Sequence, residues 1–318
     1  MKRVFAALLC AGLPFVLASG SVHAQAIADQ ALAVFPPDTQ QIAYTNFADL
    51  RSMPNYRQIA GAVLDRQVLY FENFLRSIGI DPEKDVDEVM AGWRGDPSHS
   101  SALFGLAAGR FDPAAVESFI AREHLAQRPY NGFILYASGS GVSSEDLFFV
   151  FLNPGMAAFG HLTDLEYLID AYQGQRPTLA SKGDFKAWMG ELEDSAPEWG
   201  ITTGKAALAL IAPWIEGSQK ADLARLLAPV RAVLYSVGWQ GGFSTHVSVV
   251  CDNAPDAQTL ARLLMLLKYA ASVGGEHSAA EASLLQSFAI NPSGSRVEIE
   301  GSGPPDAFAQ AIRGARAP

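Results

Sequence analysis

The sequence predicts an α+β protein of two modules, 30–195 and 196–318, each an antiparallel or mixed sheet with helices packed on one face. Past residue 30, short strand-like runs alternate with amphipathic helical runs, and several strands are joined by hairpin turns. A strand, a Pro- or Asp-marked turn and a helix recur at 111–113, 252–256 and 303–306. Such units are typical of the α+β class, because parallel sheets need strand–helix–strand crossovers. That the modules are repeats is a hypothesis.

The first 26 residues have the features of a secretory signal peptide. Two basic residues, Lys2 and Arg3, precede an apolar stretch over 4–18. A segment of small and polar residues that contains Ala24-Gln25-Ala26 follows it. We expect cleavage after Ala26 or Ala24 and a periplasmic or secreted mature chain; an uncleaved N-terminal anchor is the alternative. No later stretch reaches about 20 uninterrupted apolar residues, so no transmembrane segment is expected in the mature chain.

Composition and charge exclude some classes of function. Of the 318 residues, 49% are hydrophobic, which indicates a folded chain. The formal net charge of −10 would become −12 without the leader's two basic residues, so no nucleic-acid partner is expected, because phosphate binding needs a basic face. Loss of the leader would leave Cys251 alone, without an intramolecular disulfide, and we interpret it as a buried thiol at the end of a strand.

Apolar spacing and turn residues predict the elements of the first module. Asp81-Pro82-Glu83 has the order of an N-cap, a first-turn proline and an acidic first-turn residue, so a short helix is expected over 82–90, with Val86, Val89 and Met90 on its apolar face. Asp112-Pro113 opens a helix that reaches about residue 126. The other expected helices span 49–64, 70–78, 163–172 and 184–192, and the expected strands span 41–47, 102–111, 133–137, 146–152 and 156–161.

The second module begins with a strand over 199–203 and a helix over 205–215. A long helix over 256–272 has four leucines at core spacing. Residues 282–288 fit a helix or a strand, and a last helix is expected over 306–312. Two hairpins are expected, one pairing 230–239 with 243–251 and the other pairing 287–290 with 296–300.

No complete catalytic or cofactor motif is found: the nucleophile elbow and the phosphate-binding loops are missing. We therefore assign no catalytic, cofactor-binding or metal-ligating residue and expect no cofactor. His161 and Asp164 could approach each other, although a strand end followed by a helix start explains both. His246 shares a strand face with Ser244 and Ser248, which fits a polar outer face.

Two patterns of possible metal ligands fall short of a site. Four alternating acids resemble the opening of a calcium-binding loop; they are Asp81, Glu83, Asp85 and Asp87. Val86 stands where such a loop has its glycine, and Gly92 stands where it has its last glutamate, so helix capping explains the four acids better. His277 and Glu281 could share a helix face as zinc ligands, yet a third ligand is missing.

Low charge is the feature that points to binding. Charged residues make up 18% of the chain and the mean hydropathy is +0.11, which indicates large cores or an exposed apolar patch. The five tryptophans have no common spacing, which favours core packing over a platform for sugars. They are Trp93, Trp188, Trp199, Trp214 and Trp239.

The runs 33–39 (AVFPPDT) and 79–89 (GIDPEKDVDEV) resemble segments of exported bacterial protein families of unknown function. The resemblance implies an envelope location and an α+β build, with no catalytic residues to transfer. We expect a non-enzymatic binding or accessory module of the cell envelope, with an envelope protein or an apolar small ligand bound through one of its sheets. The alternatives are a hydrolase with a site assembled from distant residues around His161 or His246, and an inert structural element.

Overall fold

The structure is a computed structural model, and it describes part of the chain. The described residues are 23–51, 75–76, 80–94, 102–143, 146–192, 196–204, 206–207, 227–239, 242–273, 284 and 286–304. The first 22 residues of the expected leader lie outside them. So do the expected last helix and most of the helices expected over 49–64, 70–78 and 205–215.

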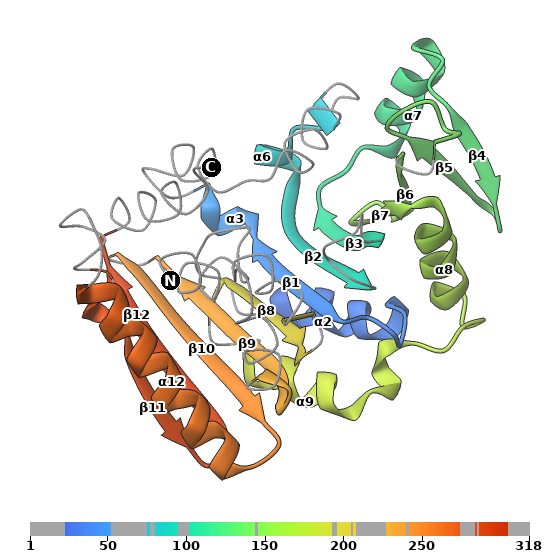
Figure 1. The fold of residues 1–318 in the computed structure, drawn as a ribbon. Coiled ribbons are helices and arrows are strands. Elements are labelled where there is room, and N and C mark those ends of the chain that lie inside the picture. Colours follow the sequence, from blue (N-terminus) through green and yellow to red (C-terminus); the bar gives the residue numbers. More distant parts are fainter. Residues whose placement is uncertain are drawn as a thin grey trace.

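The described strands form one antiparallel sheet, which confirms the predicted mixture of helices and antiparallel strands (Figure 1). The strand order is β11-β12-β10-β9-β8-β1-β2-β3-β7-β6-β5-β4, so β8 and β1 are neighbours at the centre. The bounds are β1 Gln41–Asn46, β2 Val86–Arg94, β3 Ala102–Gly109, β4 Gln127–Tyr130, β5 Phe133–Ala137, β6 Leu147–Asn153, β7 Met156–His161, β8 Glu198–Thr203, β9 Val230–Gly238, β10 Phe243–Cys251, β11 Ala289–Ser293 and β12 Arg296–Gly303.

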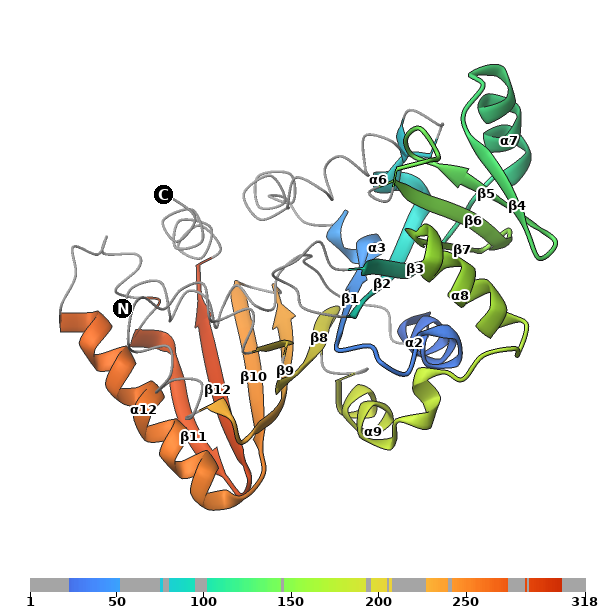
Figure 2. The same cartoon turned by 45° about the vertical axis from the view of Figure 1, so that its right-hand side comes forward.

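Helices cover both faces of this sheet (Figure 2). We call the side on which α2, α8 and α9 pack the α2 face, and the side on which α7 and α12 pack the α12 face. Among the described residues, no helix is both long and apolar enough to cross a membrane. The helices are α2 His23–Val34, α3 Phe47–Leu50, α6 Pro82–Asp85, α7 Pro113–Arg122, α8 Leu162–Tyr172, the 3-10 turn Leu179–Ser181, α9 Gly183–Leu192 and α12 Ala254–Val273.

Helices on both faces differ from the predicted packing on one face. The reason is that the central strands are apolar on both sides. On β9, Leu234 belongs to the core under α2 and α9, whereas Tyr235 and Val237 belong to the core on the α12 face. Because successive side chains of a strand point to opposite faces, each central strand needs cover on both sides.

Local signals mark two helix starts and both edges of the sheet. The start of α7 after Asp112 was expected, whereas α12 begins two residues before its expected start at 256. Asp112 accepts a hydrogen bond from the Ala115 amide at 3.1 Å and caps α7, and Asn253 accepts one from the Asp256 amide at 3.0 Å at the start of α12. The two edge strands contain Pro129 and Pro292. Proline lacks an amide hydrogen, so these edges are poor templates for pairing with another chain.

The helix expected over 82–90 is wrong beyond its first turn. Asp81 does cap a helix, through a 3.1 Å bond from the Glu83 amide, but α6 ends at Asp85 and β2 follows. Val86 packs on the α12 face and Met90 on the α2 face, because β2 lies between β1 and β3. A register shift near the start of β2 produced spacing that mimics a helix.

Two further helix starts differ from expectation. Helix α8 begins at Leu162, one residue before its expected start, and His161 occupies its N-cap position. Helix α2 was not expected. Its residues 23–26 belong to the expected leader, and its remaining residues follow the leader. Its first described side chain, Ile27, is buried against the sheet.

The two caps allow a direct test of how local signals stabilise the helices on the α12 face. We expect Asp112→Ala and Asn253→Ala each to lower the free energy of unfolding by about 1 kcal/mol, because each leaves a first-turn amide unbonded. Urea denaturation measures the change. The control is Ser118→Ala on the exposed side of α7, which should change stability by less than about 0.5 kcal/mol. Equal losses in all three variants would contradict the capping role.

Candidate functional site

His246 lies on an exposed part of the α2 face, on the same side of β10 as Ser248, and its contact is with Glu298, which the sequence analysis did not single out. Its Nε2 atom is 3.0 Å from Glu298 Oε2, and the Ser248 hydroxyl donates to Glu298 Oε1 at 3.0 Å. Glu298 therefore lies between the histidine and the serine. A hydrolytic triad needs the histidine between the acid and the nucleophile. These contacts fit a polar outer surface and give the hydrolase alternative no support.

His161 and Asp164 both lie at the start of α8, where the ion-pair partner of Asp164 is Arg94. Asp164 is buried and its carboxylate forms an ion pair with Arg94 from the end of β2. Burial raises the pKa of Asp164, and the Arg94 guanidinium and His161 act in the opposite direction. His161 Nδ1 is buried and has no hydrogen-bond partner among the described residues. Arg94, which sequence reasoning missed, is the main electrostatic partner here.

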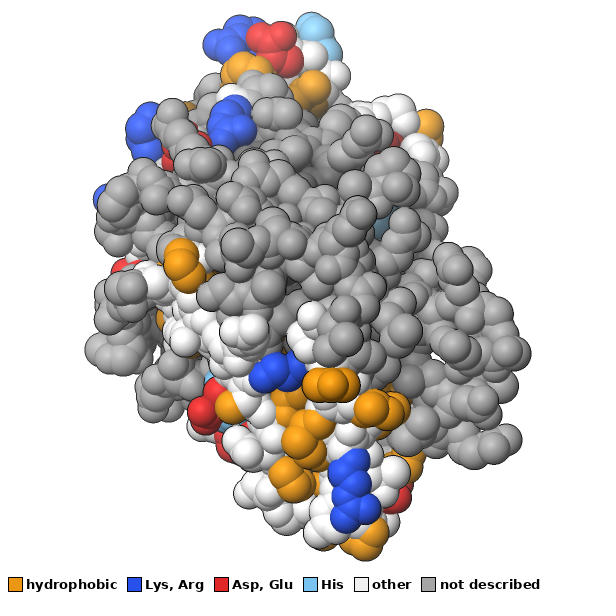
Figure 3. All heavy atoms as spheres, turned by 60° about the vertical axis from the view of Figure 1, so that its left-hand side comes forward, with side chains coloured by type: hydrophobic (Ala, Val, Ile, Leu, Met, Phe, Trp, Pro, Cys, Tyr) orange, Lys and Arg blue, Asp and Glu red, His pale blue; other side chains and the backbone are white. Residues whose placement is uncertain are grey.

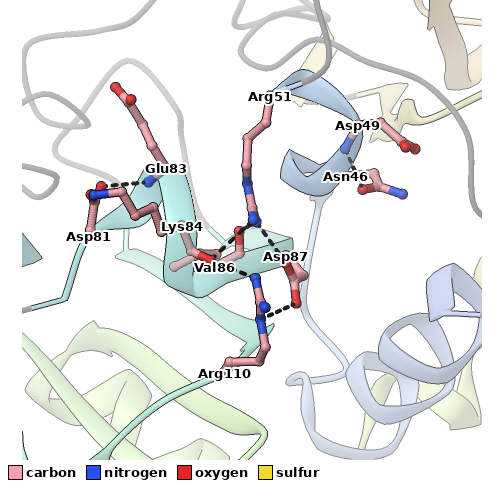
Figure 4. Close-up of polar contacts among 9 residues, drawn as sticks. All are labelled: Asn46, Asp49, Arg51, Asp81, Glu83, Lys84, Val86, Asp87 and Arg110. Carbon is pink, nitrogen blue, oxygen red and sulfur yellow. Dashed lines mark hydrogen bonds and ion pairs between the residues drawn. The ribbon is translucent and has the colours of Figure 1, made fainter.

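The four alternating acids contact arginine, lysine and backbone groups, and Figure 4 shows three of them, Asp81, Glu83 and Asp87. Lys84 Nζ lies 2.6 Å from Asp81, and the Asp81 amide donates to Asp85 at 2.7 Å. Glu83 faces Arg76 at 3.6 Å. Capping by Asp81 agrees with the sequence prediction, whereas the ion pairs of Glu83 and Asp87 were not predicted.

Arg51 forms hydrogen bonds with residues on both sides of the junction between α6 and β2 (Figure 4). Its guanidinium donates to the carbonyl oxygens of Lys84 and Val86 and to the Asp87 carboxylate. Arg110 reaches the same Lys84 carbonyl at 3.0 Å and lies 3.8 Å from Asp87. The two guanidiniums thus share one carboxylate at the carbonyl end of a helix, where positive charge is favoured.

Cys251 and the described tryptophans have structural positions. Cys251 is buried, which confirms the expected structural thiol, and burial raises the pKa of its thiol. Trp188 and Trp199 are buried on the α2 face and Trp239 on the α12 face, so these three cannot line one exposed platform. Trp93 is partly buried. Trp214, His277 and Glu281 lie outside the described residues.

Buried carboxyl groups near the centre of the sheet escaped the sequence analysis. Glu88 on β2 is 3% exposed and accepts a 2.9 Å hydrogen bond from the Tyr44 hydroxyl. Glu198 on β8 is 1% exposed, and burial raises its pKa well above the ordinary value, although the Trp239 side chain counteracts this. Asp49 on α3 has its pKa raised to about 6 by burial and by the nearby charge of Glu88.

Asp170 is a further buried acid that acts as a structural connection. It accepts hydrogen bonds from the Tyr130 hydroxyl at 3.0 Å and from Asn131 at 2.8 Å. Arg176 donates to its second oxygen at 3.1 Å. Asp170 therefore ties the β4–β5 hairpin to the end of α8.

Helix α12 carries three neighbouring exposed apolar side chains (Figure 3). Met265, Leu266 and Tyr269 are 42%, 62% and 66% exposed, whereas Leu260 and Leu264 on the other side of the helix are buried. Hydrophobic and basic side chains gather where α12 reaches the surface in Figure 3. We call Met265, Leu266 and Tyr269 the α12 patch.

Comparisons with known proteins concern the fold. No family model and no curated protein matches the chain. Crystal form I of TP0453 aligns with 90% of this chain and 98% of its own, with a TM-score of 0.50 and 12% identity. In fold, this chain is similar to TP0453. Crystal forms III and IV of TP0453 each cover 89% of this chain, with TM-scores of 0.48 and identities of 12% and 13%.

The contacts of Arg51 predict a structural role that can be measured. We expect Arg51→Ala to lower the free energy of unfolding by about 2 kcal/mol, because two carbonyl groups and Asp87 lose a charged donor. The control is Arg231→Ala, which removes an exposed ion pair to Asp184 and should cost less than about 1 kcal/mol. Denaturant titration compares the two variants, and equal losses would contradict this role of Arg51.

Proposed function

We propose that this protein is an exported binding module of the cell envelope and that it docks an apolar surface of an envelope protein through the α12 patch. The observation that carries the proposal is the exposure of Met265, Leu266 and Tyr269 beside one another on α12. Full burial of one such side chain contributes roughly 1.5–3 kcal/mol. Three of them, covered only in part, could supply several kcal/mol to an association. The binding element is then a helix, instead of the sheet face that the sequence favoured.

The export part of the proposal rests on the leader and on α2. Ile27, Ala28 and Ala31 are at most 1% exposed and pack in the core of the α2 face. Cleavage after Ala26 or Ala24 would leave all three in the mature chain. The proposed cleavage therefore removes none of the side chains that the structure describes in the core.

We also propose that 30–195 and 196–318 are two related modules. The sheet order β1-β2-β3-β7-β6 of the first module is matched by β8-β9-β10-β12-β11 of the second. Helices α7 and α12 follow β3 and β10, lie on the same face, and are capped by Asp112 and Asn253. The β4–β5 hairpin is then an insertion in the first module, between α7 and β6.

The proposed relation between the modules provides an internal comparison for the α12 patch. Helix α7 spans 10 residues, and its exposed side chains include Glu117, Ser118 and Arg122. Helix α12 spans 20 residues, and the patch lies in its second half. Large exposed apolar side chains are therefore a feature of α12 and not of α7, and the shared arrangement of strands does not require them. A surface of this kind is typical of an interaction site.

Docking through α12 can be tested in cells. We expect Met265→Ser, Leu266→Ser and Tyr269→Ser together to reduce recovery of the envelope partner at least tenfold, because the apolar contact is lost. A photo-crosslinking residue at position 262, on the exposed side of α12, captures the partner before purification. The matched control replaces Gln258 and Thr259 by serine on the polar part of the same helix.

Equal recovery of the partner with the patch variant and the control would contradict the proposal. Binding of the wild-type protein to protein-free lipid vesicles, without a captured protein, would also contradict it, since the contact would then be with lipid. Unfolding curves of the patch variant should match wild type within about 0.5 kcal/mol, which separates lost binding from lost folding.

Export can be tested on the natural product. We expect mass spectrometry of the protein from the envelope or the medium to find an N-terminus at Ile27 or Gln25, because the leader has small residues before both positions. Recovery of the chain from the cytosol with Met1 or Lys2 at its N-terminus would contradict the proposed export.

A further inference from the structure

The two expected cleavage sites leave helix α2 with different N-terminal ends. The helix spans His23–Val34, so Ala24 and Ala26 both lie in its first turn. Cleavage after Ala24 retains 25–34 of the helix, whereas cleavage after Ala26 retains 27–34. Both sites fit the sequence, because each has a small residue before the cleaved bond. The packing of α2 distinguishes the two products.

A chain that began at Ile27 would place a positive charge at the edge of the core. Ile27 is 1% exposed and Ala28 is fully buried, and both pack in the core of the α2 face. A new α-amino group is mostly charged at neutral pH, and a charge next to apolar groups loses part of its hydration. Asp29, the nearest acid along the helix, is exposed. This product would therefore weaken the packing of its own first residue.

A chain that began at Gln25 would separate that charge from Ile27 by a further turn segment of helix. In an α-helix each carbonyl oxygen accepts a hydrogen bond from the amide four residues later. The carbonyl groups of Gln25 and Ala26 would then still bond the amides of Asp29 and Gln30. The longer product thus keeps the helical hydrogen bonds around its buried side chains.

A free α-amino group on Gln25 would still be unfavourable, and the glutamine side chain can remove its charge. The N-terminal end of a helix dipole is positive, and α2 has no acidic residue in its first turn. The uncharged α-amino nitrogen of an N-terminal glutamine attacks Cδ of its own side-chain amide. The nitrogen–Cδ bond forms, the Cδ–Nε2 bond breaks, and the amide nitrogen takes a proton from the α-amino group and leaves as ammonia. The resulting pyroglutamate has no charge at the chain end.

We propose that the mature chain begins at Gln25 and that Gln25 is a modification site, converted to pyroglutamate, which gives α2 an uncharged start before its buried residues. The inference rests on the proposed export, since the α-amino group of Gln25 is free only after cleavage. It does not depend on docking through the α12 patch, which lies on another helix.

The natural protein, purified from the envelope or the medium, provides the direct test. We expect mass spectrometry to find residues 25–318 less one ammonia, and Edman degradation to release a residue only after treatment with a pyroglutamyl peptidase. A synthetic peptide of residues 25–34 with a free N-terminal glutamine, carried through the same preparation, reports any cyclisation caused by handling.

The outcomes separate this inference from the proposed export. An N-terminus at Ile27, or an unmodified Gln25, would overturn the inference and leave export standing. A chain that retains Met1 or Lys2 would overturn both.

Stability gives a second readout. Gln25→Ser, made with the leader, keeps the small residue before the cleaved bond but leaves a free α-amino group. We expect its unfolding constant to exceed that of wild type by roughly two- to fivefold at about pH 6, because a positive charge at a helix start is unfavourable. The folded state lowers the pKa of that amine, so the variant gains stability as the pH rises and the excess is lost by about pH 9.

The matched control is Gln30→Ser, the same change at an exposed position of α2. Its effect on the unfolding constant should be the same at both pH values, because it alters no charge. If Gln25→Ser and wild type show the same pH dependence between about pH 6 and pH 9, the modification of Gln25 is overturned.

Discussion

The antiparallel pairing of β1 with β8 is the constraint on which the rest of the fold depends. Residues 41–45 pair with 198–202, and through this contact the strands of the two predicted modules become one sheet. At its centre Ala43 pairs with Gly200, and the Tyr235 ring lies so close to Gly200 that a methyl group there would be 2.3 Å from its hydroxyl. A small residue is therefore required where the two halves meet.

This central pairing explains why the core has two layers. Strands at the middle of a wide sheet have neighbours on both sides, so their side chains on both faces must be covered. Tyr44 and Trp199 stack under α2 on one face, whereas Glu198 and Tyr235 are enclosed on the other. Two of the buried carboxyl groups, Glu88 and Glu198, follow from the same geometry, because they lie on strands next to β1 at the centre.

Much of the fold could be predicted from the sequence, and the failures have physical causes. Proline and aspartate signals located α7, and alternating apolar residues located most strands. The Asn131-Gly132 turn, with positive φ at both residues, is a hairpin signal that was overlooked together with β4. The helix expected over 82–90 failed because a strand buried on both faces need not show a period of two.

The candidate sites were harder to predict, because they depend on which elements become neighbours. Glu88 carried no signal in the sequence, because its burial depends on the pairing of β2 with β1 and β3. Met265 and Leu266 belong to a leucine-rich helix whose spacing indicates a core, and only the packing of α12 on β10–β12 shows which side remains exposed. The capping role of the acids after residue 80 was predictable, because it is local.

Native-state hydrogen exchange of the central strands tests the account most directly. If the β1–β8 pairing joins both halves into one sheet, amides of 42–44 and 199–201 should exchange only through global unfolding. Buried amides of β3 and β10 should then show the same free energy of opening within about 1 kcal/mol. Complete exchange of β9–β12 while β1–β3 stay protected would contradict a shared central sheet and show two halves that unfold independently.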